Sequence, residues 1–367
     1  MATDSFPGRL GLIQRVLPRY RAAFFDALAS ACVGGLSVFA GEPRRGEAIA
    51  LAERLEAARH FPARNLHLLG GPFYLCYQRG LLTWLNDWDP EALIVEANPR
   101  YLSTPAAVRW MKRRGRPVLG WGLGAPPVSS FARLRNARRM AFLRSFDALL
   151  TYSRRGAEEY AALGFPAGRI FVAPNAAAPR PAWPLPARPA RFDGRPQVLF
   201  VGRLQARKRI DLLLRACAAL PETLQPQLVI IGEGPARPAL EGLAVQIYPR
   251  AEFPGAKHGE DLLPYFLAAD LFVLPGTGGL AVQQAMAYGL PVIMGAGDGT
   301  NDDLVRPANG WQVPPDDLRA LTEALRAALA DPARLRAMGA ESYRIVCEEI
   351  NLERMTAAFV AALKAVG

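Results

Sequence analysis

Histidine, cysteine and acidic side chains are scarce in this 367-residue sequence. It contains only 3 histidines and 4 cysteines, and the cysteines lack the spacing of metal ligands or of a redox pair. We therefore expect neither a metal centre nor a cofactor, and we expect the thiols to be reduced and structural. The acidic motif Asp87-Trp88-Asp89 precedes an apolar run instead of ending one, so it is interpreted as part of a turn.

Long apolar runs are absent as well. No stretch is apolar over the roughly 20 residues that a membrane-spanning helix needs. The first ten residues, MATDSFPGRL, also lack the apolar core of a secretory signal. From these absences we expect a cytoplasmic protein, and peripheral attachment to the inner face of the cytoplasmic membrane is one hypothesis.

Acidic residues number 33 against 44 lysines and arginines, which leaves a formal net charge of +11. The excess is concentrated in residues 111–116 and 131–146. In the second run, arginines alternate with Phe, Leu and Met, as in a helix that lies on an anionic membrane surface. The alternative is an ordinary amphipathic helix whose apolar face packs on a sheet. A nucleic-acid partner is not expected, because stacking aromatics and recognised nucleic-acid modules are missing.

The sequence alternates between short runs of Val, Ile and Leu and amphipathic segments. This alternation predicts βαβ units with parallel sheets, and the chain length predicts two domains. The proline-rich run APRPAWPLPARPA sustains neither helix nor central strand and indicates an interdomain linker. The predicted organisation is an N-terminal domain over 1–176, a linker over 177–195, a C-terminal domain over 196–345 and a last segment over 346–367. The runs expected to form strands are 93–95, 118–120, 148–151, 170–173, 198–201, 228–231 and 271–274.

The glycine-rich turn at 275–279 is the strongest local sign of a binding site. It follows the apolar run 271–274 and precedes a helical pattern that begins near Leu280. Its glycines remove side chains that would block a ligand, and the N-terminus of the helix would present free N–H groups to a phosphate. The alternative is that the glycines only make a tight turn between strand and helix.

Two basic residues follow another apolar run. The run 198–201 ends at Gly202, Arg203 follows at once, and Lys208 comes five residues later. Because ligands of open parallel sheets bind beyond the carboxyl ends of the strands, we expect both cations to face the same crevice as the glycine-rich turn. Together they could neutralise a diphosphate, whereas the alternative is that they are solvated surface residues.

These motifs occur in the order and spacing of a known family. Gly202, Arg203 and Lys208 match its strand followed by Gly-Arg and Lys, and VIIGEGP at 229–235 matches its Gly-x-Gly-Pro turn. The run QAMAYGLPV at 284–292 matches its E-A-M-A-x-G-x-P-V helix. The C-terminal half therefore resembles the nucleotide-sugar-binding half of a family-four retaining glycosyltransferase (group 1 type) with the GT-B fold. The resemblance is strong over 198–313 and weak in the N-terminal half.

The resemblance implies an α/β protein with two Rossmann-like domains that face each other across a cleft. It further implies transfer of a sugar from a nucleoside diphosphate sugar to a glycan, lipid-linked or small-molecule acceptor, with retention and without metal. Arg203 and Lys208 would be the catalytic residues that stabilise the leaving diphosphate. The last segment is expected to form a helix that crosses back to the N-terminal domain. The residues expected to bind the donor are Gly202, Gly234, Gly278, Gly279, Leu280, Ala281, Gln283 and Gln284.

The N-terminal half carries a weaker resemblance. Residues 15–29 resemble the first strand, loop and helix of bacterial transferases of this type, with the loop overlooking the cleft. Further residues follow the apolar runs 93–95 and 118–120 and occupy crevice positions by the same rule of strand ends. The residues expected on the acceptor side are Arg19, Tyr20, Arg21, Asn98, Arg100, Trp121 and Leu123.

Three positions depart from the family pattern. Two signature glutamates fall on Gly276 and Gln284, and a histidine falls on Leu123. The Gln284 amide can still hydrogen-bond a ribose, whereas Gly276 offers only backbone. In the front-face substitution discussed for this family, the leaving diphosphate takes the acceptor proton, so the missing carboxylate need not abolish transfer. The alternative is a catalytically inactive GT-B protein that serves as a binding or scaffold subunit.

Overall fold

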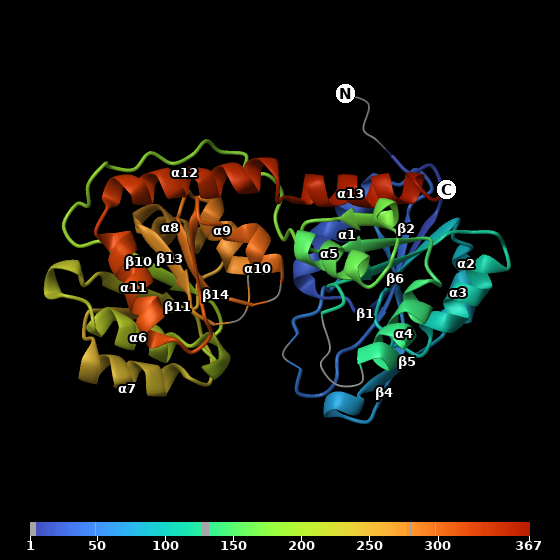
Figure 1. Ribbon diagram of the computed structural model, residues 1–367, viewed down its shortest axis with the longest axis horizontal. Helices are drawn as coiled ribbons and strands as arrows, with labels where there is room; N and C mark the ends of the chain where they lie inside the picture. The colour runs from blue at the N-terminus through green and yellow to red at the C-terminus, as the bar shows by residue number, and fades with distance from the viewer. Residues whose placement is uncertain (1–4, 48, 127–131, 277, 279, 298) are drawn as a thin grey trace. The chain divides into compact units, whose positions relative to one another are not determined.

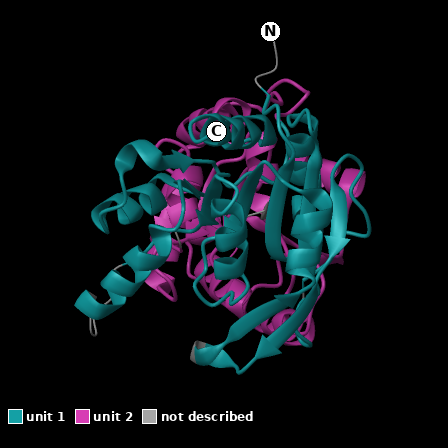
Figure 2. Cartoon of the chain, turned by 90° about the vertical axis from the view of Figure 1, so that its right-hand side faces the viewer, with its two compact units in different colours: residues 1–179, 351–367 teal, residues 180–350 magenta. Residues whose placement is uncertain are grey.

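The computed structural model describes residues 5–47, 49–126, 132–276, 278, 280–297 and 299–367 (Figure 1). The chain divides into two compact units (Figure 2). Unit 1 comprises Met1–Pro179 with Asn351–Gly367, and unit 2 comprises Arg180–Ile350. Each unit contains one parallel sheet with helices packed on it, so the predicted α/β class is confirmed.

Unit 1 is built on a seven-stranded sheet in the order β3-β2-β1-β6-β7-β8-β9, in which all neighbours are parallel. A separate antiparallel hairpin joins β4 and β5. The elements of unit 1 are β1 (Leu10–Val16), η1 (Arg19–Arg21), α1 (Ala22–Ser30), β2 (Leu36–Gly41), β3 (Arg59–Pro62), β4 (Arg64–Leu68), η2 (Gly71–Phe73), β5 (Leu75–Arg79), α2 (Leu81–Trp88), β6 (Ala92–Glu96), α3 (Thr104–Lys112), β7 (Val118–Gly122), α4 (Ala132–Leu143), β8 (Ala148–Thr151), α5 (Arg154–Ala162), η3 (Ala167–Arg169), β9 (Ile170–Val172) and α13 (Leu352–Lys364).

Both faces of the unit 1 sheet are covered by helices. On one face, side chains of α2 to α5 pack against β1 and β6, as the cluster of Trp84, Met111 and Met140 with Val95 shows. The opposite face is covered by α1 and by the C-terminal helix α13, which contact each other. Strands buried on both faces are the reason that their sequences are nearly continuous apolar runs.

Unit 2 is built on a six-stranded parallel sheet in the order β12-β11-β10-β13-β14-β15. The strand order reverses between β10 and β13, and such a switch point is where open α/β sheets bind ligands. The elements of unit 2 are β10 (Gln197–Val201), η4 (Ala206–Lys208), α6 (Ile210–Ala218), η5 (Glu222–Leu224), β11 (Gln227–Ile231), α7 (Arg237–Ile247), β12 (Ala251–Gly255), η6 (Gly259–Leu262), α8 (Leu263–Ala268), β13 (Leu271–Leu274), α9 (Leu280–Ala287), β14 (Val292–Gly295), α10 (Gly299–Leu304), β15 (Gly310–Val313), α11 (Leu318–Leu329) and α12 (Pro332–Glu348).

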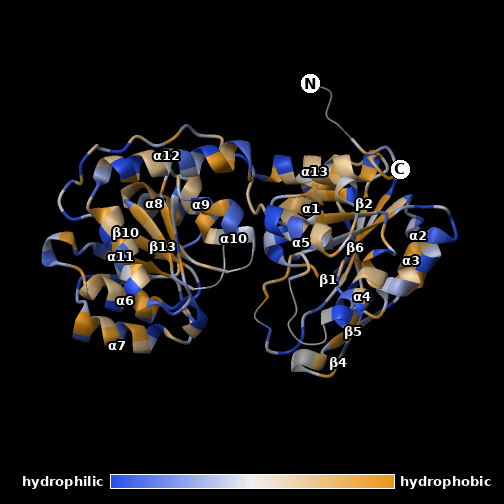
Figure 3. Ribbon diagram, in the orientation of Figure 1, coloured by the Kyte–Doolittle hydropathy of each residue, from blue (hydrophilic) through white to orange (hydrophobic). Residues whose placement is uncertain are grey.

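Hydrophobic residues are concentrated in the strands of the sheets, while the helices contain both hydrophobic and hydrophilic residues (Figure 3). Every residue of β13 and β14 is buried. The seven apolar runs predicted to be strands coincide with β6 to β11 and β13, so these predictions are confirmed. The hairpin of β4 and β5 was not predicted.

The proline-rich segment, predicted to be a linker, packs closely on unit 2. The Arg188 guanidinium donates hydrogen bonds to the carbonyls of Phe266 at 2.8 Å and Leu267 at 3.0 Å, at the end of α8, and also to that of Ala269. Burial lowers the pKa of this guanidinium to about 10. The ring of Trp183 stacks on Tyr288 with centroids 5.1 Å apart. Residues 180–195 are therefore anchored along unit 2.

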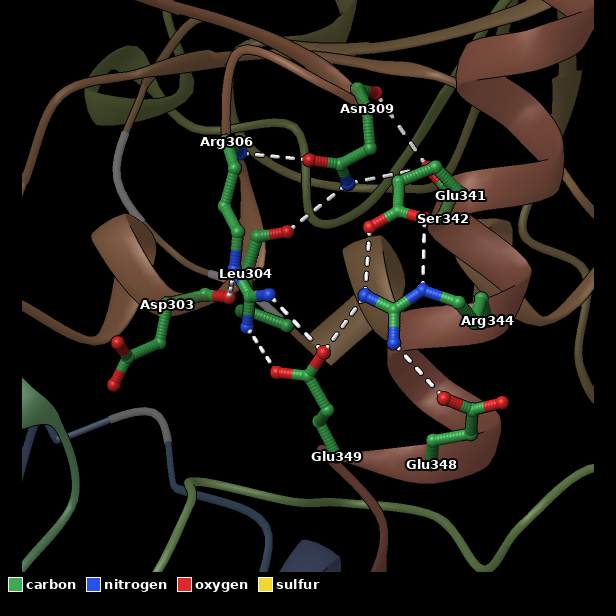
Figure 4. Close-up of polar contacts among 9 residues, drawn as sticks. All are labelled: Asp303, Leu304, Arg306, Asn309, Glu341, Ser342, Arg344, Glu348 and Glu349. Atoms are coloured by element: carbon green, nitrogen blue, oxygen red, sulfur yellow. Dashed lines mark hydrogen bonds and ion pairs between the residues drawn. The ribbon is translucent and has the colours of Figure 1, made fainter.

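A network of ion pairs stabilises the end of α12, where the chain leaves unit 2 (Figure 4). Glu349 accepts hydrogen bonds from Arg306 at 2.6 Å and from Arg344 at 2.8 Å, and these contacts lower its pKa to about 2. The side chain of Asn309 donates to Leu304 O and to Ser342. Helix α12 runs unbroken through residue 346, where the sequence placed the start of the last segment, and α13 then packs in unit 1.

No helix in the described part of the chain is long and apolar enough to cross a membrane. All four cysteines are free thiols, and only Cys347 is more than slightly exposed. Burial raises the pKa of the Cys32 thiol to about 12, which keeps it protonated at neutral pH.

Candidate functional site

In unit 2, the loops that follow β10 and β11 are held together by their backbones. The amide of Gly202 donates to Ile231 O, and that of Leu204 donates to Glu233 O, both at 2.9 Å. A Cβ on Gly232 would collide with the carbonyl of Gly202, and a Cβ on Gly234 would lie 2.8 Å from the carbonyl carbon of Leu204. The glycines of the Gly-x-Gly turn are thus required by the close approach of the two loops.

The turn after β13 packs in the same way against η4. A Cβ on Gly276 would collide with the carbonyl oxygen of Arg207 and would lie 2.6 Å from the Cα of Lys208. No side chain fits at Gly276 unless the backbone of η4 moves. This packing gives a steric reason for glycine at the position where the resemblance places a glutamate.

Lys208 extends from η4 onto the glycine-rich turn. Its ammonium lies where a Cβ of Gly278 would be, and Gly278 itself has the positive φ of 124° that glycine tolerates. Burial, with a smaller contribution from the neighbouring Arg207, lowers the pKa of Lys208 to about 8. Two residues selected from distant parts of the sequence, Lys208 and Gly278, therefore meet at the switch point of the sheet.

The remaining cations of this loop differ in their surroundings. Arg203 and Arg207 are exposed, and Arg207 donates to Gln205 at 3.1 Å. Arg209, in contrast, forms ion pairs with Asp211 and Asp316. The carboxyl end of β10 consequently carries an excess of positive charge that suits an anionic ligand.

The donor-side residues of α9 lie in different environments. Leu280 opens the helix, Ala281 is half-buried and Gln283 is only 5% exposed. Gln284 lies on the wall of a groove of about 620 Å³ between α8, α9 and the proline-rich segment. Gly279 falls outside the described residues. The groove is lined by Trp183, Pro184, Pro186, Gly259, Glu260, Leu263, Leu267, Gln284 and Tyr288.

In unit 1, Arg21 joins the loop after β1 to helix α13, where its guanidinium lies 3.7 Å from the sulfur of Met355. It is 5% exposed, and it donates hydrogen bonds to Asn175 and, at 3.3 Å, to the carbonyl of Ala176. Its guanidinium lies 5.4 Å from the ring of Trp121 and 5.2 Å from that of Tyr152. Its contacts make Arg21 a structural cation at the edge of the candidate acceptor site.

The other acceptor-side candidates range from buried to exposed. Trp121 is 2% exposed and packs edge-on against Phe359 of α13, with centroids 4.9 Å apart. The remaining five lie at the surface or near it. Tyr20 is 45% and Leu123 58% exposed, Arg19 and Arg100 are also exposed, and Asn98 is half-buried.

Glu96, the last residue of β6, was missed by the sequence analysis. Its carboxylate accepts a hydrogen bond from the backbone amide of Arg15, and burial raises its pKa to about 7. A single carboxylate at the end of the apolar run ALIV was the signal that could have identified it. A carboxyl group poised near neutral pH at a strand end is typical of functional sites.

The basic run 131–146 contains helix α4, and its apolar residues largely face the core. Met140, Leu143 and Phe146 belong to the buried cluster of unit 1. Leu134, in contrast, is 54% exposed, and several arginines of the run are also exposed. This packing agrees with the interpretation of α4 as an ordinary amphipathic helix.

Potential metal ligands do not gather in the described residues, which contain no group of three or more His, Cys, Asp or Glu side chains placed to hold an ion. Asp89, from the acidic motif in the sequence, forms ion pairs with Arg9 at 3.0 Å and with Arg116.

Each half of the chain matches a family of known proteins. The family described as "Glycosyl transferases group 1" matches residues 183–345, and the "Glycosyl transferase 4-like domain" matches residues 18–176. A GDP-mannose-dependent monoacylated alpha-(1-6)-phosphatidylinositol monomannoside mannosyltransferase of Corynebacterium glutamicum is 35% identical over 177 residues. That match covers 44% of this chain and 45% of the relative, so the chain spans less than half the length of this relative.

Solved structures match nearly the whole chain. A sucrose-phosphate synthase from Thermosynechococcus elongatus has a TM-score of 0.68 at 22% identity, covering 97% of this chain and 98% of that one. Anabaena Alr3699/HepE, solved in complex with UDP, has a TM-score of 0.67 at 14% identity, covering 97% and 99%. The similarity confirms the expected GT-B fold.

Proposed function

We propose that this chain, whose halves both match glycosyltransferase families, transfers a hexosyl group from a nucleoside diphosphate sugar to a hydroxyl acceptor. The observation that carries the proposal is the position of the Lys208 ammonium against Gly278, at the switch point of the unit 2 sheet. A diphosphate there would meet a cation, bare backbone and the N-terminus of α9 together.

In the proposed reaction the bond between the anomeric carbon and the diphosphate breaks, and the acceptor oxygen bonds to that carbon on the same face. The acceptor proton passes to the leaving diphosphate oxygen. Lys208, together with Arg203 after the same strand, stabilises the negative charge that accumulates on the diphosphate. Gln284 is proposed to bind the ribose. No carboxylate at Gly276 takes part, because packing against η4 leaves no room for one.

The donor and acceptor classes are proposed from the relatives. One relative is named as GDP-mannose-dependent, and one structural neighbour holds UDP, so GDP-mannose and UDP-sugars are the first donors to test. That relative's name also specifies a phosphatidylinositol mannoside acceptor. We propose a peripheral position at the inner face of the membrane, where the exposed arginines of α4 would meet anionic lipid.

The test is a transfer assay with GDP-mannose, UDP-glucose and UDP-galactose in the presence of membrane extract. Turnover that is lost in Lys208→Ala and retained in Arg215→Ala supports the proposal, because Arg215 is an exposed arginine of α6 outside the site. If every donor is inert but nucleotides still bind, the chain is the non-catalytic GT-B subunit considered as the alternative.

A further inference from the structure

The hairpin of β4 and β5 is attached to the rest of unit 1 by polar side chains. Asn65 donates hydrogen bonds to the carbonyl of Arg15 at 2.6 Å and to that of Glu42 at 2.8 Å. Gln78, which pairs with Asn65 in the hairpin, donates to the carbonyl of Gln14 at 3.0 Å. Because paired residues point to the same face of a hairpin, the inner face, which is turned toward β1, is polar.

The outer face of the hairpin is apolar instead. Four apolar residues alternate onto it by the register of the two strands: Leu66, Leu68, Leu75 and Tyr77. Leu68 and Tyr77 are each 43% exposed, and the other two are half-buried. An antiparallel sheet with one free face normally turns its polar residues to water. The reversed pattern indicates that another apolar surface covers this outer face.

The turn between the two strands continues the apolar surface. Leu69 is 72% and Phe73 is 75% exposed. Leu69 also has a φ of 58°, a left-handed conformation that glycine adopts more easily than leucine. The turn therefore keeps a large apolar side chain in water at a position where glycine would fit better. The hairpin lies toward the lower end of unit 1 in both views (Figures 1 and 2).

The other end of the hairpin carries two cations. Arg64 pairs directly with Arg79, and both side chains are exposed. Among the described residues, neither arginine has an ion-pair partner. Like charges directly opposite each other on two strands repel, and residues 64–79 contain no Asp or Glu that could offset the repulsion. An anionic partner would remove it.

We propose that this hairpin inserts its turn into an anionic lipid surface. Leu69 and Phe73 enter the boundary between the headgroups and the acyl chains, and Tyr77 lies at the interface. Arg64 and Arg79 then pair with the lipid phosphates. The inference rests on the peripheral membrane position proposed above and names the segment that enters the membrane.

The length of the hairpin fits one leaflet of a bilayer. A strand rises about 3.3 Å per residue, so the arginine pair lies about 13 Å along the hairpin from Leu68. Peripheral segments bury their apolar residues about 5–10 Å deep, which leaves the two arginines at the level of the phosphates. From turn to base the hairpin is apolar, then aromatic, then cationic. A leaflet has the same order of polarity from acyl chains to headgroups, and this match favours a lipid surface over a protein partner.

The test is flotation of the full chain with vesicles of phosphatidylcholine that contain about 30% phosphatidylglycerol, and we expect the wild type to bind them. Leu69→Ser with Phe73→Ser should weaken the binding at least about tenfold, because two large apolar side chains no longer insert. Arg64→Gln with Arg79→Gln should weaken it about 30-fold, because two cations leave the anionic surface.

Two matched controls should bind as the wild type does. Leu82→Ser with Val245→Ser removes exposed apolar side chains of α2 and α7. Arg215→Gln with Arg326→Gln removes the same number of charges from exposed positions of α6 and α11.

The proposal is overturned if the Leu69→Ser, Phe73→Ser variant floats as well as the wild type does, since charge alone would then hold the chain. It is also overturned if the wild type forms a dimer in ultracentrifugation that this variant loses, because a second copy would then cover the outer face. A wild type that does not float refutes the peripheral position together with the hairpin. GDP and UDP binding on the same samples tests the transferase proposal separately and should be unchanged in every variant.

Discussion

Substitution of Gly276 by alanine tests the architecture of the proposed diphosphate site. The new Cβ would collide with the carbonyl oxygen of Arg207 and lie 2.6 Å from the Cα of Lys208. These are backbone atoms of η4 and cannot move aside as the tip of a flexible side chain would. Gly276→Ala must therefore displace η4, and Lys208 with it.

The expected loss of affinity follows from the position of the Lys208 ammonium. It lies against Gly278, where the proposal places the diphosphate. A hydrogen bond to a charged group contributes about 1.5–3 kcal/mol, so losing the Lys208 contact should weaken nucleotide binding about 10- to 150-fold. The affinity for ligands that lack the diphosphate, such as the free nucleosides, should be unchanged.

Calorimetric titration with GDP and UDP measures this loss. The matched control is Gly242→Ala on α7, where a new Cβ meets nothing within 4 Å. That control should keep its affinity and gain up to about 1 kcal/mol of stability, because alanine favours a helix interior. If Gly276→Ala binds nucleotide as the wild type does, the proposed link between the turn, η4 and the diphosphate is wrong.

Four further predictions concern pH and stability. Because Lys208 has a pKa of about 8 in the protein without nucleotide, nucleotide affinity measured by calorimetry should fall above pH 8 as the ammonium loses its proton. A flat profile to pH 9.5 would count against the site. The pKa of Glu96 is raised to about 7, so its ionised form destabilises the fold. Glu96→Gln should therefore raise the free energy of unfolding by about 1–2 kcal/mol at pH 8 and by almost nothing at pH 4. An equal gain at both pH values would contradict the raised pKa. The pKa of Glu349 is lowered to about 2, so Glu349→Gln should cost about 1–3 kcal/mol at pH 7, and the difference from wild type should vanish as the pH falls toward 2 in denaturant titrations. Arg188→Ala should lower stability by about 2–4 kcal/mol, whereas the exposed Arg191→Ala should leave it unchanged, and equal melting temperatures would show that the proline-rich segment is not anchored.

Local sequence patterns predicted the strand ends at which we propose the donor site. The apolar run before Gly202 and the run before the glycine-rich turn were visible in sequence, and the rule of strand ends placed Lys208 near Gly278. The sequence could not show that Gly276 packs against η4. That contact joins segments about 70 residues apart and depends on backbone geometry alone.

Long-range contacts also explain the features that were missed. Glu96 lies beside Trp121 only because β6 and β7 are neighbours in the sheet. The proline-rich composition indicated a linker, but it could not show that Arg188 donates hydrogen bonds to backbone carbonyls of α8. The strand β4, with sequence RNLHL, has exposed ends and a half-buried middle without alternation, so it gave no usable signal.

The most direct test of the central claim is calorimetric titration of the double variant Arg203→Ala, Lys208→Ala with GDP and UDP, beside Arg215→Ala as control. We predict that the double variant loses at least about 100-fold in affinity for both nucleotides, while the control binds as the wild type does. Unchanged affinity in the double variant would contradict the assignment of the diphosphate site to the switch point of unit 2.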